Sequence, residues 1–333
     1  NKQRKYSERS IKISRLNFRP KFGSIIMKKQ SFKNNLSLSS LKDSMQKIKT
    51  NVYRSGFFRI TVDSDCQTFN NYIKQRLAFP AQYAPASETI PIHYILRVSP
   101  DHKNTFSINH SLQTVHIAYT RSFLNDHERA FETFIHFPMV DLMYRKQYLF
   151  FHAGMVQFKK NTVFIIGSCA SGKSTVSCLL KKIGGKLLCD DKVYIRKKQG
   201  VFQAIPFPTR IRMRNETRKK VLSGTIYRPE AIRDAGQFRK AIFLFPEYSS
   251  QTKPSLTIGT KRLGAERLIK DNLSLFALQQ NDVARHMQDF NLCCSLAKNG
   301  VFYGIKYNDA NLNELSCILK QTLLSKHHAP GIT

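Results

Sequence analysis

One short stretch of the chain, Gly167-Ser168-Cys169-Ala170-Ser171-Gly172-Lys173-Ser174, has the residue types and spacing needed to bind the phosphates of a nucleotide. It fits the pattern G-x-x-x-x-G-K-[ST] in full. Glycine lets the backbone curl so that several N–H groups point at one phosphate, and the dipole of the following helix reinforces them. Lys173 would bridge β- and γ-phosphate oxygens, and the Ser174 hydroxyl would bind Mg²⁺. The stretch, extended by Thr175, therefore predicts a site for ATP with Mg²⁺.

Two adjacent carboxylates, Asp190 and Asp191, follow this loop after one helix and one short strand. A triphosphate site uses carboxylates to hold Mg²⁺, directly or through water, and to accept the proton of an attacking hydroxyl. We therefore predict both as metal ligands and as candidates for the catalytic base, without assigning the base to either. Acids so close repel each other, so another cation or Lys173 has to help keep both ionised. The alternative is a solvated Asp-Asp-Lys turn.

Other candidate residues are less specific. His152 lies in an apolar strand, and its spacing alone does not decide between an active-site and a core histidine. Arg210, Arg212 and Arg214 alternate with apolar residues, so they face one side of a predicted strand as a phosphate site or as an exposed basic face. Glu216 follows them and is a further candidate metal ligand.

The elements around the loop suit a phosphate site. The apolar run 162–166 predicts a strand before the loop, and helical spacing after it predicts an amphipathic helix that ends at Gly184-Gly185. The apolar runs 149–156 and 162–166, joined by a short polar connection, predict an antiparallel hairpin that leads into the loop. These flanking elements argue against a chance match in a loop that only turns the chain.

The chain divides into four predicted segments. Residues 1–50 are rich in Lys, Arg, Ser and Asn without a sustained apolar period, which predicts a flexible basic arm. Residues 51–145 predict an α+β lobe, residues 146–325 an α/β catalytic domain, and residues 326–333 a tail. Predicted strands cover 57–62, 93–98, 114–119, 240–245 and 300–307, and the run 186–195 is a strand that ends at the two carboxylates and resumes after them. Predicted helices cover 130–143, 265–271, 274–298 and 311–324.

Composition sets the class of protein. The chain has 333 residues, 41% of them hydrophobic, which is enough for one large core or two smaller ones. Its formal net charge of +32 attracts any anion but selects none. The 7 cysteines lack CxxC or Cys/His spacing, which predicts reduced thiols in a cytoplasmic protein. No apolar run reaches the roughly 18 residues of a transmembrane helix, and the first residues lack the apolar core of a signal peptide.

The residues described above resemble the catalytic domain of HPr kinase/phosphorylase and its relatives. The resemblance is carried by His152-Ala153-Gly154, the hairpin into residues 167–175, Cys189-Asp190-Asp191 and Pro206-Phe207-Pro208. It covers about residues 148–307 and is strongest between His152 and Asp191. The relatives include serine kinases encoded with lasso-peptide and other ribosomal peptide clusters and, more distantly, phosphoenolpyruvate carboxykinase.

This resemblance implies an α/β (α+β) fold with an HPr kinase/PEP carboxykinase-like P-loop domain and an N-terminal lobe. It implies transfer of phosphate from ATP to a serine hydroxyl of a peptide or small protein, such as a precursor peptide; a homo-oligomer is compatible with it. Position by position, His152 matches the active-site histidine, and Lys173 and Ser174 match the phosphate and metal ligands. Asp190 and Asp191 match the acidic pair that includes the base.

Two departures from the family pattern stand out. The loop interior reads Ser168-Cys169-Ala170 in place of the usual glycines, which is tolerated if these positions do not need a positive φ. The glycine-rich signature downstream of the acidic pair is missing, since Arg210 to Glu216 contains no glycine. Its absence argues against phosphorylation of HPr itself and against the reverse phosphorolysis.

We therefore expect an ATP-dependent serine kinase. One alternative is a non-catalytic, ATP-binding regulatory module, but nucleotide binding alone does not require a base. A nucleic-acid-binding protein is suggested by the net charge of +32 and ranks last, because no aromatic RNP strand or GxxG loop accompanies the charge.

Overall fold

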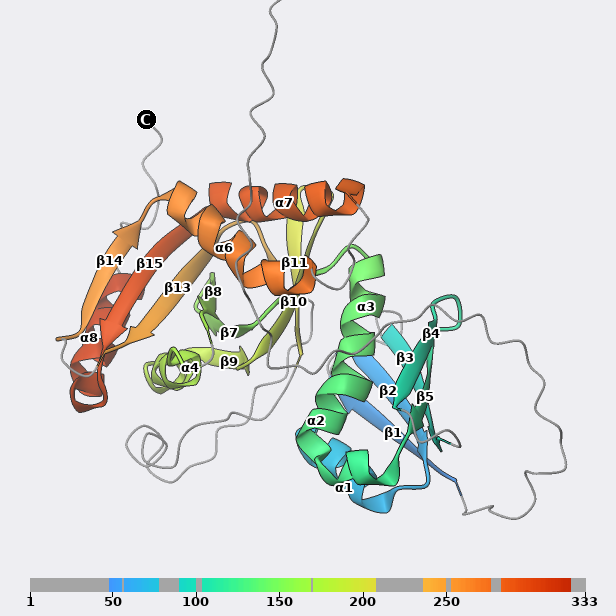
Figure 1. The fold of residues 1–333 in the computed structure, drawn as a ribbon. Helices are drawn as coiled ribbons and strands as arrows, with labels where there is room; N and C mark the ends of the chain where they lie inside the picture. The colour runs from blue at the N-terminus through green and yellow to red at the C-terminus, as the bar shows by residue number, and fades with distance from the viewer. Residues whose placement is uncertain are drawn as a thin grey trace, which may run out of the picture. The chain divides into compact units, whose positions relative to one another are not determined.

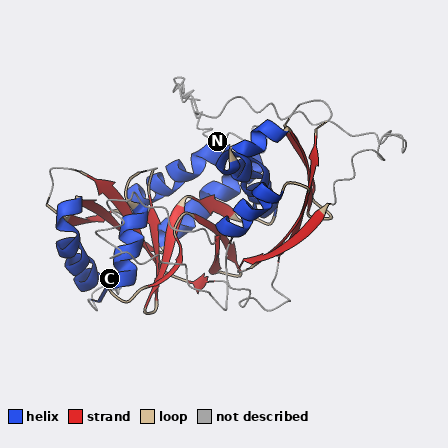
Figure 2. Cartoon of the chain, turned by 90° about the horizontal axis from the view of Figure 1, so that it is seen from below, coloured by secondary structure: helices blue, strands red, loops and turns tan. Residues whose placement is uncertain are grey.

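The computed structural model describes residues 48–55, 57–77, 90–99, 104–168, 170–207, 236–249, 253–276 and 283–324. Residues 1–47, nearly all of the segment expected to be a flexible basic arm, lie outside these ranges. The described residues mix helices and strands throughout, as an α/β protein does, and the strands form three sheets (Figure 1 and Figure 2). Within the described ranges, no helix combines the length and the apolar character that crossing a bilayer requires.

The first sheet has five strands in the order β1-β2-β3-β5-β4. Its strands are β1 (Lys49–Ser55), β2 (Phe58–Ser64), β3 (Ile90–Val98), β4 (Thr105–Asn109) and β5 (Thr114–Tyr119). Along β2, Phe58, Ile60 and Val62 are fully buried while the residues between them are more exposed, because side chains of a strand alternate between its faces. The strands expected near 57–62, 93–98 and 114–119 are therefore confirmed. β1 begins at Lys49, inside the segment expected to be a flexible arm.

Helices join this first sheet to the rest of the chain. They are α1 (Gln67–Arg76), the 3₁₀-helix η2 (Arg121–Asn125), α2 (His127–Phe131), the π-helical segment η3 (Glu132–His136) and α3 (Phe137–Arg145). Asp126 caps α2 by accepting a hydrogen bond from the Arg129 amide at 3.0 Å, as its position before the apolar period predicts. The helix expected over 130–143 is confirmed in extent, but it contains the π-helical segment. Pro138, which has no N–H to donate, lies two residues after the end of that segment, in the first turn of α3.

The second sheet contains the P-loop strand and has six strands in the order β14-β15-β13-β8-β7-β9. Its strands are β7 (Ala153–Phe158), β8 (Asn161–Ile166), β9 (Lys186–Cys189), β13 (Ala241–Tyr248), β14 (Ser255–Gly259) and β15 (Gly300–Tyr307). β7 and β8 form the expected antiparallel hairpin, whereas β8, β13 and β15 run parallel. The P-loop therefore leaves the end of β8 beside the ends of β13 and β15.

Helices cover both faces of this sheet (Figure 1). They are α4 (Lys173–Lys182), α6 (Lys261–Phe276), α7 (Val283–Lys298) and α8 (Leu312–Leu324), the last preceded by the 3₁₀-helix η4 (Asp309–Asn311). Phe164 and Phe243 pack in one core with residues of α6 and α7, while Val163 and Ile242 pack in another with residues of α4 and α8. The continuous apolar runs of β8 and β13 are thus explained by burial on both faces.

The third sheet has four strands in the order β12-β11-β10-β6. They are β6 (Leu149–Phe151), β10 (Lys192–Lys198), β11 (Val201–Phe207) and β12 (Gly236–Phe238). β6 precedes β7, β10 follows β9 and β12 precedes β13, so the chain passes three times between the second and third sheets. The first passage is at His152, the second at Asp190-Asp191 and the third between Phe238 and Ala241.

Several boundaries differ from the sequence prediction. The single strand expected over 149–156 is two strands in different sheets. The run 186–195 is interrupted at the acidic pair as expected, but its two strands also lie in different sheets. The helix expected to begin at Ser274 begins at Val283, because α6 extends to Phe276. Gly184 takes a φ of 101° directly after Ile183, which confirms the expected end of the P-loop helix. Residues 208–235, with Arg210, Arg212, Arg214 and Glu216, lie outside the described ranges.

Candidate active site

The passage from β6 to β7 and the passage from β9 to β10 lie side by side, which brings His152 next to the acidic pair. Phe151 of β6 pairs with Val193 of β10, and Met155 of β7 pairs with Cys189 of β9. The connecting residues between these paired strands therefore run side by side. This arrangement places His152 opposite Asp191 although the two are 39 residues apart in sequence.

The predicted phosphate loop, residues 167–172, connects the end of β8 to the start of α4. Gly172, with a φ of 98°, is the N-cap of α4, and its carbonyl accepts the Val176 amide at 3.0 Å. The Tyr307 hydroxyl of β15 donates to the same carbonyl at 3.2 Å, and a Cβ on Gly172 would collide with that hydroxyl. Glycine is therefore required here both for its conformation and for its lack of a side chain.

One residue of the loop interior has a positive φ. Ala170 has a φ of 64°, so the condition for tolerating the Ser168-Cys169-Ala170 replacement is not met at Ala170. A left-handed conformation costs a non-glycine residue about 1–2 kcal/mol. Cys169 itself lies outside the described residues.

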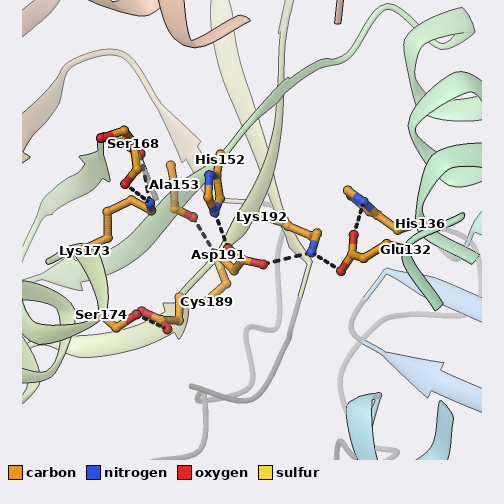
Figure 3. A network of polar contacts seen from close by, with 12 residues as sticks. Glu132, His136, His152, Ala153, Ser168, Lys173, Ser174, Cys189, Asp191 and Lys192 are labelled. Carbon is orange, nitrogen blue, oxygen red and sulfur yellow. Dashed lines mark hydrogen bonds and ion pairs between the residues drawn. The ribbon is translucent and has the colours of Figure 1, made fainter. Parts of the chain in front are cut away.

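Lys173 begins α4 and points back along its own loop. Its ammonium donates to the carbonyls of Gly167 and Ser168, both at 2.9 Å, and the residue is 7% exposed. The lysine therefore fastens the loop as well as bringing a positive charge to the end of the helix where a phosphate is favoured. Figure 3 shows this turn of the side chain toward Ser168.

Asp190 is hydrogen-bonded to Ser174, the second residue of α4. The Ser174 hydroxyl donates to its Oδ2 at 2.8 Å, and Asp190 is 3% exposed. A solvated Asp-Asp-Lys turn is inconsistent with this burial. Ser174 and Asp190 together present two oxygen atoms of the kind that Mg²⁺ prefers, beside the N-terminus of α4.

Asp191 has different partners. Its Oδ1 lies 2.5 Å from the Nε2 of His152, and its Oδ2 accepts from the Lys192 ammonium at 2.8 Å (Figure 3). Burial opposes ionisation of Asp191, but the hydrogen bond from His152 and the charge of Lys192 outweigh it and hold the pKa of Asp191 well below its usual range. Lys192 is therefore a cation bonded to Asp191 of the acidic pair, and the sequence analysis required another cation or Lys173 for this role.

A third carboxylate, Asp271 of α6, reaches the same region. It is hydrogen-bonded to the His152 backbone, and it interacts electrostatically with the side chains of Lys173 and His152. Burial raises the pKa of Asp271 to about 6, against the opposing effect of these two residues. Asp271 was not predicted as a site residue, because no motif or spacing links its helix to the loop.

Asp271→Asn is expected to stabilise the protein at pH 8 and to have little effect at pH 4. A carboxyl with a raised pKa binds its proton more tightly in the folded chain, so its contribution to stability is present below about pH 4 and is lost as pH rises through about 6. The loss is up to about 3 kcal/mol for a shift of this size. Urea unfolding of both proteins at pH 4, 6 and 8 measures it, with Asp63→Asn as a control; equal pH dependence in wild type and Asp271→Asn would contradict it.

Comparisons with known proteins add little to this geometry. No protein-family model matches the chain, and no curated protein matches it. Among solved structures, the chain is similar to the Hpr(Ser) kinase/phosphatase from Coxiella burnetii, with 14% sequence identity and a TM-score of 0.25, over 52% of this chain and 93% of that one. Likeness at this level does not establish a shared activity, so the function has to rest on the site.

The site residues suit a nucleotide with Mg²⁺. Ser174 and Asp190 supply oxygen ligands, and the glycine-capped start of α4 supplies backbone N–H groups. Within the described ranges, no group of three or more His, Cys, Asp or Glu could hold a metal ion. In nucleotide sites, Mg²⁺ needs only one or two carboxylates, because phosphate and water complete its coordination. Asp191, with both oxygens bonded to basic side chains, suits this role less well than Asp190.

Proposed function

We propose that this chain binds ATP with Mg²⁺ at residues 167–175 and transfers the γ-phosphate to a serine hydroxyl of a peptide or small protein. The observation that carries the proposal is the separation of the two carboxylates. Asp190 is bonded to Ser174 at the phosphate loop, whereas Asp191 is bonded to His152 and Lys192. A site that only bound nucleotide would have no use for the second carboxylate.

The chain's own residues hold the nucleotide. The backbone N–H groups at the start of α4 bind the phosphates, and Lys173 moves its charge from the loop carbonyls to the β- and γ-phosphate oxygens. Ser174 and Asp190 hold the metal. When bound, Mg²⁺ would neutralise the negative charge that develops during transfer.

Asp191 orients the acceptor and receives its proton. With a pKa well below its usual range, the carboxylate stays ionised and accepts a hydrogen bond from the serine hydroxyl. A base this weak removes little of the proton in the ground state. The hydroxyl becomes acidic as its oxygen bonds to phosphorus, and the proton then moves to the carboxylate. Orientation is therefore the larger part of its contribution.

His152 lies at the accessible side of the acidic pair. Its side chain is 39% exposed, compared with 30% for Asp191. Its Nε2–H donates to the Asp191 carboxylate and fixes the direction of one oxygen. A peptide acceptor would approach from this side, and the formal net charge of +32 favours an acidic one.

The test is phosphate transfer from γ-labelled ATP, with Mg²⁺, to a panel of serine peptides that differ in charge. Each peptide is paired with a copy in which serine is replaced by alanine, and the phosphate is located by mass spectrometry. We expect label on serine and faster transfer to acidic peptides. Binding of ATP without transfer to any acceptor, and without consumption of ATP, would instead favour the regulatory module.

A further inference from the structure

A chain of polar contacts runs from Asp191 to the π-helical segment η3. The Lys192 ammonium donates to Asp191 Oδ2 at 2.8 Å and to Glu132 Oε1 at 2.9 Å. The other Glu132 oxygen lies 2.9 Å from the Nδ1 of His136. Figure 3 shows the five side chains of this polar chain, His152, Asp191, Lys192, Glu132 and His136, following one another without interruption.

The geometry points to Glu132 as a positioning residue for the Asp191 carboxylate, acting through Lys192. This inference rests on the proposed function, since it assigns the region around residues 127–145 a part in the same phosphate transfer. Lys192 lies at the first position of β10, directly after the pair, and Glu132 lies 60 residues away in sequence. A contact across such a distance fixes Lys192 from the side opposite Asp191.

Burial makes Lys192 depend on the two carboxylates that it connects, Asp191 and Glu132. Lys192 is 5% exposed, so its ammonium depends on carboxylates in place of water. A lysine side chain has four rotatable bonds, and a single carboxylate partner would leave its ammonium free to approach Asp191 from several directions. With Glu132 as the second partner, the ammonium meets Oδ2 of Asp191 and leaves Oδ1 to His152. With one donor held on each oxygen, the plane of the carboxylate is fixed, and each oxygen keeps a lone pair that can accept a hydroxyl.

The surroundings of Glu132 keep it charged and in place. Burial opposes its ionisation, but the hydrogen bond from His136 and the charge of Lys192 outweigh it and hold the pKa of Glu132 well below its usual range. The Arg76 guanidinium lies 3.8 Å away on a third side. His136 is packed against Phe150 and Phe207, with ring centroids 5.1 and 6.1 Å away. π-helical segments occur often at functional sites, and this one carries both Glu132 and His136.

The experiment compares kcat and KM for ATP in four variants of the full chain. Glu132→Gln keeps the shape and removes the charge; Lys192→Met removes the ammonium, and Lys192→Arg keeps a cation that can bridge two carboxylates. Asp63→Asn is the matched control, because Asp63 also binds a histidine, His93, at 2.8 Å and is 19% exposed, compared with 28% for Glu132. Circular dichroism checks that each variant is folded.

We expect Glu132→Gln and Lys192→Met to lower kcat about 10-fold to 100-fold with KM for ATP nearly unchanged, as loss of a supporting partner of an active-site group does. Lys192→Arg should recover most of the loss, and Asp63→Asn should match the wild type. An unchanged kcat in Glu132→Gln, or an equal loss in Asp63→Asn, would overturn the positioning role while leaving the kinase activity standing.

Failure of the proposed function has a different signature. If the wild type transfers no phosphate, the nitrogen resonances of the His152 ring, measured by NMR on histidine-labelled protein, decide the question. A change in these resonances in Glu132→Gln, with none in Asp63→Asn, supports the link from Glu132 to Asp191. Identical resonances in wild type and Glu132→Gln overturn it.

Discussion

Replacing Lys173 with alanine is expected to lower phosphate transfer about 10²-fold to 10³-fold or more, the range for removing one preorganised donor to transition-state charge. The variant loses the charge at the start of α4, and it also loses the two hydrogen bonds to Gly167 and Ser168 that fasten the loop. Both KM for ATP and kcat should therefore change. Steady-state kinetics with a serine peptide, together with ATP binding by calorimetry, measures the two effects.

Lys182→Ala is the matched control for this variant. Lys182 lies in the last turn of the same helix and is exposed, so its loss removes one positive charge without touching the loop. Its kinetics should match the wild type. If Lys173→Ala keeps wild-type transfer, the phosphate loop is not the site of the reaction.

The second large effect is expected for Asp191→Asn, with kcat lowered about 10²-fold to 10⁴-fold, as for loss of a general base. Asparagine keeps the size of the side chain but cannot receive the proton of the acceptor hydroxyl. KM for ATP should change little, because Asp190 and Ser174, and not Asp191, lie at the loop. Loss of the carboxylate also removes one of the two carboxylates, Asp191 and Glu132, to which Lys192 donates, so thermal unfolding has to be measured beside the kinetics.

Asp190→Asn separates the two roles. It should raise the Mg²⁺ concentration needed for half-maximal rate, whereas Asp191→Asn should leave that concentration unchanged. The same Mg²⁺ dependence in both variants would show that the two aspartates do not divide the work in this way.

Local patterns predicted much of the fold. The hairpin β7 to β8, the end of α4 at Gly184 and the strand β15 follow from apolar spacing and glycine placement. The break at His152 does not, because one apolar run continues through it while the chain changes sheets. Periodicity records burial, and it does not record which sheet a strand joins.

The candidate site was predictable only where it is contiguous. Residues 167–175 form a motif within one segment, so their spacing is visible in the sequence. Lys192 was named from the sequence only in the alternative of a solvated turn, and its partner Glu132 is 60 residues away. Asp271 lies on a helix without any chemical motif. Such contacts arise from tertiary packing, which leaves no local pattern.

We propose that the two adjacent aspartates between the second and third sheets have different roles, with Asp190 at the metal and Asp191 at the acceptor hydroxyl. A crystal structure with Mg²⁺ and a non-hydrolysable ATP analogue tests it most directly. We predict the phosphates at the start of α4, the metal beside Ser174 and Asp190, and the Asp191 carboxylate facing the γ-phosphate from the side of His152. A nucleotide bound elsewhere, or a metal held by Asp191 in place of Asp190, would contradict it.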